Sequence, residues 1–202
     1  TEQNTGCIHD YTLTTNDMKK IENADIFIQN GLGLEIFMDK IFTIYPNLKV
    51  LDASINIKNV IKEDEVNPHV WTSIENYINQ VKEISQVLIQ QNSENKQIYE
   101  ENTEKYIKDL EKVEKQYEEI SQELNGQKAI CLNEALEYLA KDIKLEYISL
   151  HTDHDENSMS AESIKNIINK MNTENIKIIL IGKDDSIKNA EILANETNAK
   201  IY

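Results

Sequence analysis

The chain has 202 residues, 40% of them hydrophobic, with only 5 Gly and 2 Pro. This length can form one large domain or two small lobes with their own cores, and the composition excludes a disordered chain. The net charge is −15, and every basic residue is Lys. So acidic a surface repels nucleic acid and anionic membranes, which excludes both as direct partners. No run of 18 apolar residues occurs, and we expect neither a membrane-spanning helix nor a visible signal peptide or membrane anchor.

Strand-like and helical patterns alternate in the first third of the chain. Thr14 or Thr15 with Asp17 forms a plausible helix N-cap ahead of Met18. Short apolar runs at Ile26–Gln29 and Lys49–Leu51 predict strands. Between them, the next helix is predicted from one apolar face: Leu34, Phe37, Met38, Ile41 and Phe42.

Two longer helices are predicted after residue 72. The first covers about 73–90, and the second about 94–124, roughly 45 Å at 1.5 Å per residue. The apolar stripe of the second helix contains Tyr99, Tyr106, Leu110, Val113, Tyr117, Ile120 and Leu124. Such a stripe fits a coiled-coil seam as readily as a helix that connects two lobes. The α/β segments on both sides favour the connecting helix, with Tyr106, Leu110, Val113 and Tyr117 buried.

The last third again reads as strands separated by helices. Apolar runs occur at Ala129–Leu132, Tyr147–Leu150, Ile176–Ile181 and Lys200–Tyr202. Continuous rather than alternating hydrophobicity is typical of parallel strands buried on both faces. The fold class is therefore α/β, with two lobes of parallel sheet flanked by helices and joined by one long helix. The predicted segments are an N-terminal lobe at 1–92, the connecting helix at 93–125 and a C-terminal lobe at 126–202.

Two histidines stand in similar short loops ahead of helices. His9 lies in Gly-Cys-Ile-His-Asp-Tyr, and His69 lies in Asn-Pro-His-Val-Trp. Imidazole binds zinc and related ions well, and loops on a rigid scaffold are where such ligands usually lie. A solvated surface role is the alternative for each histidine.

These loops, together with Asn-Gly-Leu-Gly-Leu-Glu at 30–35, resemble the zinc/manganese solute-binding proteins of bacterial ABC importers. The resemblance runs from about Gly6 to Tyr202. It implies two α/β lobes, a long connecting helix and a metal ion in the cleft between the lobes. It also implies an extracytoplasmic receptor, at the cell surface or in the periplasm and often a lipoprotein, that passes its ion to a membrane permease.

The resemblance implies four metal ligands, the fourth of them an acid late in the second lobe, around residues 182–187. His9 and His69 correspond to the first two, whereas the third position holds Asn133, whose amide oxygen is a poor zinc ligand beside imidazole. His151 and His154, in a loop after the strand at 147–150, are alternatives for the missing ligand, because ligands bind at the carboxyl ends of parallel strands. A solvated acidic loop is the competing interpretation. The expected ion is Zn²⁺, with Mn²⁺ as the alternative.

Other functions and contacts follow less directly from the residues. A relative that binds metal weakly or not at all and serves in adhesion is the main alternative, because of Asn133. An enzyme is not expected, since no phosphate loop, Gly-x-Ser-x-Gly or His-Glu-x-x-His motif occurs.

Cys7 and Cys131 could be one disulfide or two thiols, although Cys131 lies in an apolar strand typical of an inert buried thiol. The first lobe lacks the strand–helix–strand that opens it in the resembling family, which predicts self-association through an incomplete sheet edge.

Overall fold

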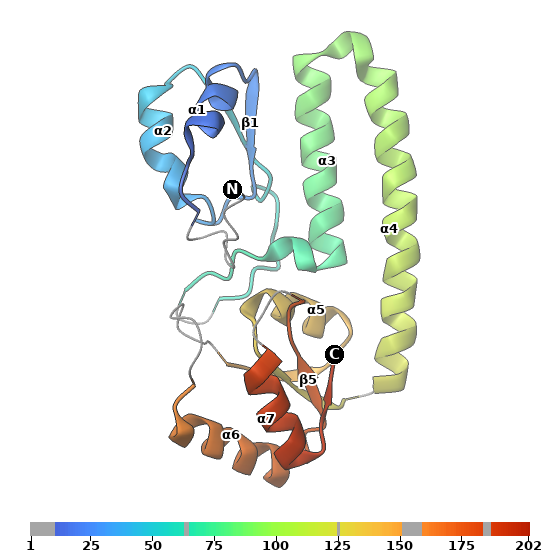
Figure 1. The fold of residues 1–202 in the computed structure, drawn as a ribbon. Coiled ribbons are helices and arrows are strands. Elements are labelled where there is room, and N and C mark those ends of the chain that lie inside the picture. Colours follow the sequence, from blue (N-terminus) through green and yellow to red (C-terminus); the bar gives the residue numbers. More distant parts are fainter. Residues whose placement is uncertain (1–10, 63–64, 125, 151–158, 184–186) are drawn as a thin grey trace. The chain divides into compact units, whose positions relative to one another are not determined.

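The computed structural model describes residues 11–62, 65–124, 126–150, 159–183 and 187–202. The chain divides into two compact units, one formed by Thr1–Trp71 with Glu75–Leu110 and the other by Thr72–Ile74 with Glu111–Tyr202 (Figure 1). The long helix thus contributes residues to both units. The three sequence-based segments, with boundaries after residues 92 and 125, stay a prediction of the domain organisation.

The first unit contains a two-stranded parallel sheet, with β1 (Ile26–Gln29) paired to β2 (Lys49–Asp52). Before it lies α1 (Thr15–Glu22), which begins with a capping box between Thr14 and Asp17, as the sequence predicted. Its core is a cluster of Ile21, Met38 and Ile41 with partly buried aromatic side chains around it. Apolar burial of this kind stabilises the unit by roughly 25 cal/mol per Å² removed from water.

The predicted helix over residues 34–42 is instead a 3₁₀ turn followed by a short α-helix. These are η2 (Ile36–Met38) and α2 (Asp39–Ile44). Ahead of them, residues 31–33 all have positive φ, so the chain enters the turn through left-handed backbone. The apolar face is still buried, since Leu34, Met38 and Ile41 are in the core. Apolar spacing gave the correct face but not the helix type.

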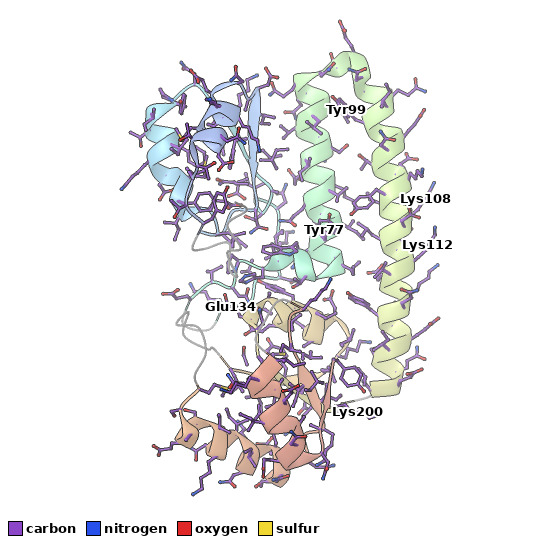
Figure 2. The ribbon with its side chains drawn as sticks, viewed as in Figure 1. Tyr77, Tyr99, Lys108, Lys112, Glu134 and Lys200 are labelled. Carbon is purple, nitrogen blue, oxygen red and sulfur yellow. The ribbon has the colours of Figure 1, made fainter. Side chains whose placement is uncertain are left out.

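Two antiparallel helices follow η3 (Val70–Thr72). They are α3 (Ile74–Gln91) and α4 (Lys96–Leu124), joined through η4 (Ser93–Asn95) (Figure 1). Both agree with the predicted helices to within two residues, so the connecting-helix interpretation of 94–124 is confirmed. Side-chain pairs join α3 to α4: Thr103 donates to Ser85 at 2.7 Å, and the Tyr77 and Tyr106 hydroxyls lie 3.0 Å apart. Figure 2 labels Tyr77 on α3 and Tyr99, Lys108 and Lys112 on α4.

The inward face of α4 differs in part from the predicted apolar stripe. Leu110 is buried, as predicted, and Val113 and Tyr117 are half-buried. The predicted burial of Tyr106 is wrong, because 44% of this residue is exposed. Its hydroxyl reaches the Tyr77 hydroxyl, and the two rings pack edge to face with their centroids 6.1 Å apart. A polar residue, Ser121, is buried on the same helix instead.

The second unit is a four-stranded parallel sheet in the order β4-β3-β5-β6. Its strands are β3 (Lys128–Cys131), β4 (Glu146–Ser149), β5 (Ile178–Leu180) and β6 (Lys200–Ile201). Its helices are η5 (Glu134–Leu136), α5 (Glu137–Asp142), α6 (Ala161–Thr173) and α7 (Ile187–Thr197). Separate apolar clusters pack on the two faces of the sheet, which explains the continuous hydrophobicity of its central strands. The predicted α/β fold with parallel sheets is confirmed.

Candidate functional site

His69 lies in a loop between β2 and η3 and is 6% exposed. Its ring Nδ1 lies 2.9 Å from the side-chain oxygen of Asn67, and its backbone N–H donates to the same oxygen at 3.0 Å. Because a carbonyl oxygen only accepts, Nδ1 carries the proton in the neutral ring, and the lone pair resides on Nε2. This is how proteins usually orient a metal-binding imidazole, with one ring nitrogen held by an oxygen acceptor.

The backbone around His69 forms a tight three-residue turn. The N–H of Val70 donates to the carbonyl of Pro68 at 2.8 Å, and residues 67–70 are all buried. The Trp71 ring lies 5.2 Å from the His69 ring, centroid to centroid. The imidazole is therefore fixed by backbone, amide and aromatic contacts together, as a preorganised ligand requires.

The segment after β1 supports this loop from the side. The Glu35 carboxylate accepts the N–H groups of Asn30, at 2.7 Å, and Gly31, at 3.1 Å. Gly31 has a φ of +86°, and a Cβ at this position would lie 2.1 Å from the Asp52 carboxylate. Only glycine fits there, because both the backbone conformation and the contact with Asp52 exclude a side chain. The Asn-Gly-Leu-Gly-Leu-Glu element thus fixes the backbone of Asn30 through hydrogen bonds to Glu35.

Asn133 lies in the short bend between β3 and η5 in the second unit. Its side-chain oxygen accepts from the backbone N–H of Ala135 at 2.8 Å and caps η5. This gives Asn133 a structural role, since Asn is among the preferred helix N-cap residues. Four residues on, Glu137 is 1% exposed and accepts a hydrogen bond from the Ser149 hydroxyl at the end of the neighbouring strand.

Three of the five predicted metal ligands, His9, His151 and His154, lie outside the described residues. Cys7 lies outside them as well. Within the part of the chain that the structure describes, no three His, Cys, Asp or Glu side chains are close enough together to hold a metal ion. The ligand set of His9, His69, Asn133, His151 and His154 therefore stays a prediction.

Cys131 is a free and fully buried thiol. Burial, with a smaller contribution from the charge of Glu137, raises the pKa of the thiol to about 12. Since metals and electrophiles react with the thiolate, we expect this side chain to be inert at neutral pH. The predicted burial of Cys131 in a strand is confirmed, and its inertness stays a prediction.

Sequence reasoning missed the polar residues that support His69. Gln80, on α3, is 4% exposed and donates to the Asn30 side chain at 2.8 Å. Asn67 was noted only as part of a motif, although it sets the orientation of the imidazole. One signal was available for Gln80, because it lies three residues after Tyr77 and four before Ile84, on the inward side of a regular amphipathic helix.

The structure defines a class of protein: an α/β chain of two units, each with a parallel sheet, in which the buried His69 imidazole is held in a fixed orientation. The family model for the zinc-uptake complex component A, periplasmic (ZnuA), matches residues 3–202. The chain belongs to this family.

Several curated proteins are similar to the chain. The high-affinity zinc uptake system protein ZnuA of Bacillus subtilis (strain 168) is 26% identical over 95% of the chain and 66% of its own length. The iron-binding protein YfeA of Yersinia pestis is also 26% identical, over 96% of the chain and 64% of its own length. The chain therefore spans about two thirds of the length of these relatives.

Solved structures share the fold. A crystal structure of ZnuA matches with a TM-score of 0.84 and 23% identity, over 96% of the chain and 76% of the other protein. A manganese-bound periplasmic metal-binding protein from Candidatus Liberibacter asiaticus has a TM-score of 0.77 and 30% identity, over 96% and 74% respectively. In the described residues, no helix is long and apolar enough to cross a membrane.

Proposed function

We propose that the chain is the metal-capturing part of a solute-binding protein that supplies a divalent transition metal to an ABC importer. The observation that carries this proposal is the buried His69 ring, whose Nδ1–H is held by Asn67 so that Nε2 has the metal-binding lone pair. The chain's membership of the ZnuA family also supports the proposal.

The proposed ligands are His9 and His69, with Asn133 and either His151 or His154 completing the set. Asn133 is the weakest member, because its oxygen already caps η5 and an amide oxygen is a poor zinc ligand. A third imidazole from the loop after β4 would raise the affinity well above that of two histidines.

Zinc is the proposed ion, with manganese as the alternative. Imidazole-rich ligand sets suit zinc, whereas manganese prefers carboxylate oxygens. Relatives are named for zinc, iron and manganese, as in the ZnuA of Bacillus subtilis, YfeA and the manganese ABC transporter substrate-binding lipoprotein PsaA of Streptococcus anginosus. An extracytoplasmic location and a permease partner follow from the same proposal, as does a binding rather than a catalytic role.

Metal analysis of the protein purified without added metal, followed by calorimetric titration with Zn²⁺ and Mn²⁺, tests the proposal. We expect one equivalent of metal and tight Zn²⁺ binding that His69→Ala abolishes. Binding unaffected by His69→Ala would overturn it. A folded protein that binds neither ion would support the alternative, a relative that retained the fold for adhesion.

A further inference from the structure

The peptide group ahead of His69 is held by a side chain from a distant part of the chain. The Pro68 carbonyl accepts from the backbone N–H of Val70 at 2.8 Å and from Asn30 Nδ2 at 2.9 Å. Asn30 lies directly after β1, 38 residues earlier. The turn that carries His69 is therefore anchored to the sheet of the first unit and not only to its own neighbours.

Three contacts fix the direction of the Asn30 amide. Its Nδ2 donates to the carbonyls of Pro68 and Gly31, and its Oδ1 accepts from Gln80 Nε2 at 2.8 Å. Hydrogen bonds therefore run in one direction, from Gln80 through Asn30 to the Pro68 carbonyl. A hydrogen-bond acceptor at position 80 would not fit this arrangement, because it would face the Asn30 Oδ1 atom, which is also an acceptor.

The surroundings make these bonds persistent. Gln80 is 4% exposed, and Pro68 and His69 are buried. Hydrogen bonds out of contact with water are stronger electrostatically and are costly to break. Burying a neutral amide that serves only packing would be unfavourable, so a polar residue at position 80 of this amphipathic helix needs a reason.

We propose that Gln80 and Asn30 form an amide relay that holds the His69 turn in its metal-binding orientation. Both are positioning residues, and their effect on metal binding rests on the proposed function. The relay acts on the backbone before His69, whereas Asn67 acts on the imidazole itself. Residues that orient metal ligands in this way typically change affinity about 10- to 100-fold when removed.

Two variants test the relay. Gln80→Met keeps the length of the side chain but removes the donor, and Gln80→Glu places an acceptor opposite Asn30 Oδ1. Gln86→Met, at an exposed position on the same helix, is the matched control. The readouts are the ¹⁵N and ¹³C imidazole signals of His69 in metal-free protein, assigned with His69→Ala, and the affinity for Zn²⁺ at a temperature where each variant is folded.

We expect shifted or doubled His69 imidazole signals in both Gln80 variants and an affinity for Zn²⁺ about 10-fold lower, with neither change in Gln86→Met. Folded Gln80 variants with unchanged His69 signals would overturn the relay, as would equal changes in the control. If one variant does not fold, the other decides. If the unmodified protein binds no Zn²⁺, the proposed function fails, and the signals of the metal-free protein still decide the relay.

Discussion

The Nδ1 atom of His69 lies 2.9 Å from the side-chain oxygen of Asn67, and the backbone N–H of His69 reaches the same oxygen at 3.0 Å. One amide oxygen therefore fixes both the turn and the tautomer of the imidazole. The side chain of Asn readily accepts a hydrogen bond from the backbone N–H two residues later in the chain, and this bond also favours the turn.

Replacing Asn67 with Ala should lower the affinity for Zn²⁺ about 10- to 100-fold, since the Nδ1–H tautomer would lose its acceptor. Isothermal titration measures the affinity, and imidazole ¹⁵N shifts of the metal-free protein report the tautomer. Asn102→Ala, at an exposed position on α4, is the control. An unchanged tautomer in a folded Asn67→Ala protein would contradict this role for Asn67.

Leu110→Ala should destabilise the protein by about 2–5 kcal/mol, because this side chain is 8% exposed and its removal leaves a cavity. Urea denaturation measures the free energy of unfolding. Ile98→Ala on the same helix, where the side chain is 56% exposed, should change it by about 0.5 kcal/mol or less. A loss below half a kcal/mol for Leu110→Ala would show that this face of α4 does not pack in the core.

Asp17 should make stability depend on pH at the acidic end. Hydrogen bonds from the Thr14 side chain, the Tyr11 hydroxyl and the Thr14 backbone lower the pKa of this carboxyl to about 2, from 3.8. Because the folded state holds the carboxylate more tightly, its contribution is complete above about pH 5 and is lost as the pH falls from 4 towards 2.

Thermal unfolding from pH 7 to pH 2 checks this sign. Asp17→Asn should melt below the unmodified protein near pH 7, and the difference should shrink as the pH falls below 4. Asn102→Ala, at an exposed position on α4, carries no titratable group and should show no such trend. If the melting temperatures of Asp17→Asn and the unmodified protein differed by the same amount at every pH, the lowered pKa of Asp17 would make no contribution to stability.

Ser149→Ala should cost about 1–3 kcal/mol, since the Glu137 carboxyl is 1% exposed and would lose a donor. Ser93→Ala, on the exposed turn before α4, is the control and should have an effect several-fold smaller. Denaturant unfolding followed by circular dichroism makes the comparison. Equal effects of the two substitutions would mean that the Ser149 bond does not stabilise the buried carboxyl.

Local sequence patterns predicted the regular elements well, and the reason is physical. The central strands of the second unit, β3 and β5, are buried on both faces, so they appear as continuous apolar runs. The sequence located β3 to within one residue and β5 to within two. The region 34–42 was mistaken for one helix because a 3₁₀ turn leading into a short α-helix buries a similar set of positions. Periodicity identifies the buried face, but it does not distinguish a 3₁₀ turn from an α-helix, because both bring a side chain back to the same face after three or four residues.

The polar side chains that support the candidate site were harder to predict from the sequence. Gln80 and Asn30 lie 50 residues apart, and no local pattern pairs them. Polar residues on a helix are usually solvated, so a buried Gln and the buried Glu137 were not recognised. His69 could be singled out from the sequence, because imidazole in a loop ahead of a helix is a chemical signal independent of the fold. Its role as a metal ligand, and that of His9, His151 and His154, stays a prediction.

The second-unit histidines should differ in their contribution to metal binding. If the loop after β4 supplies one imidazole, either His151→Ala or His154→Ala should lower the affinity for Zn²⁺ by at least 10-fold, and the other should leave it nearly unchanged. His9→Ala and His69→Ala should each abolish tight binding, because two imidazoles alone make a weak site. Calorimetric titration of the four variants at pH 7.5, where imidazole is neutral, makes the comparison.

Tight Zn²⁺ binding by a protein that lacks both His9 and His69 would contradict the receptor function. If His151 and His154 both proved dispensable, the site would be a two-histidine remnant, and the adhesion alternative would gain support.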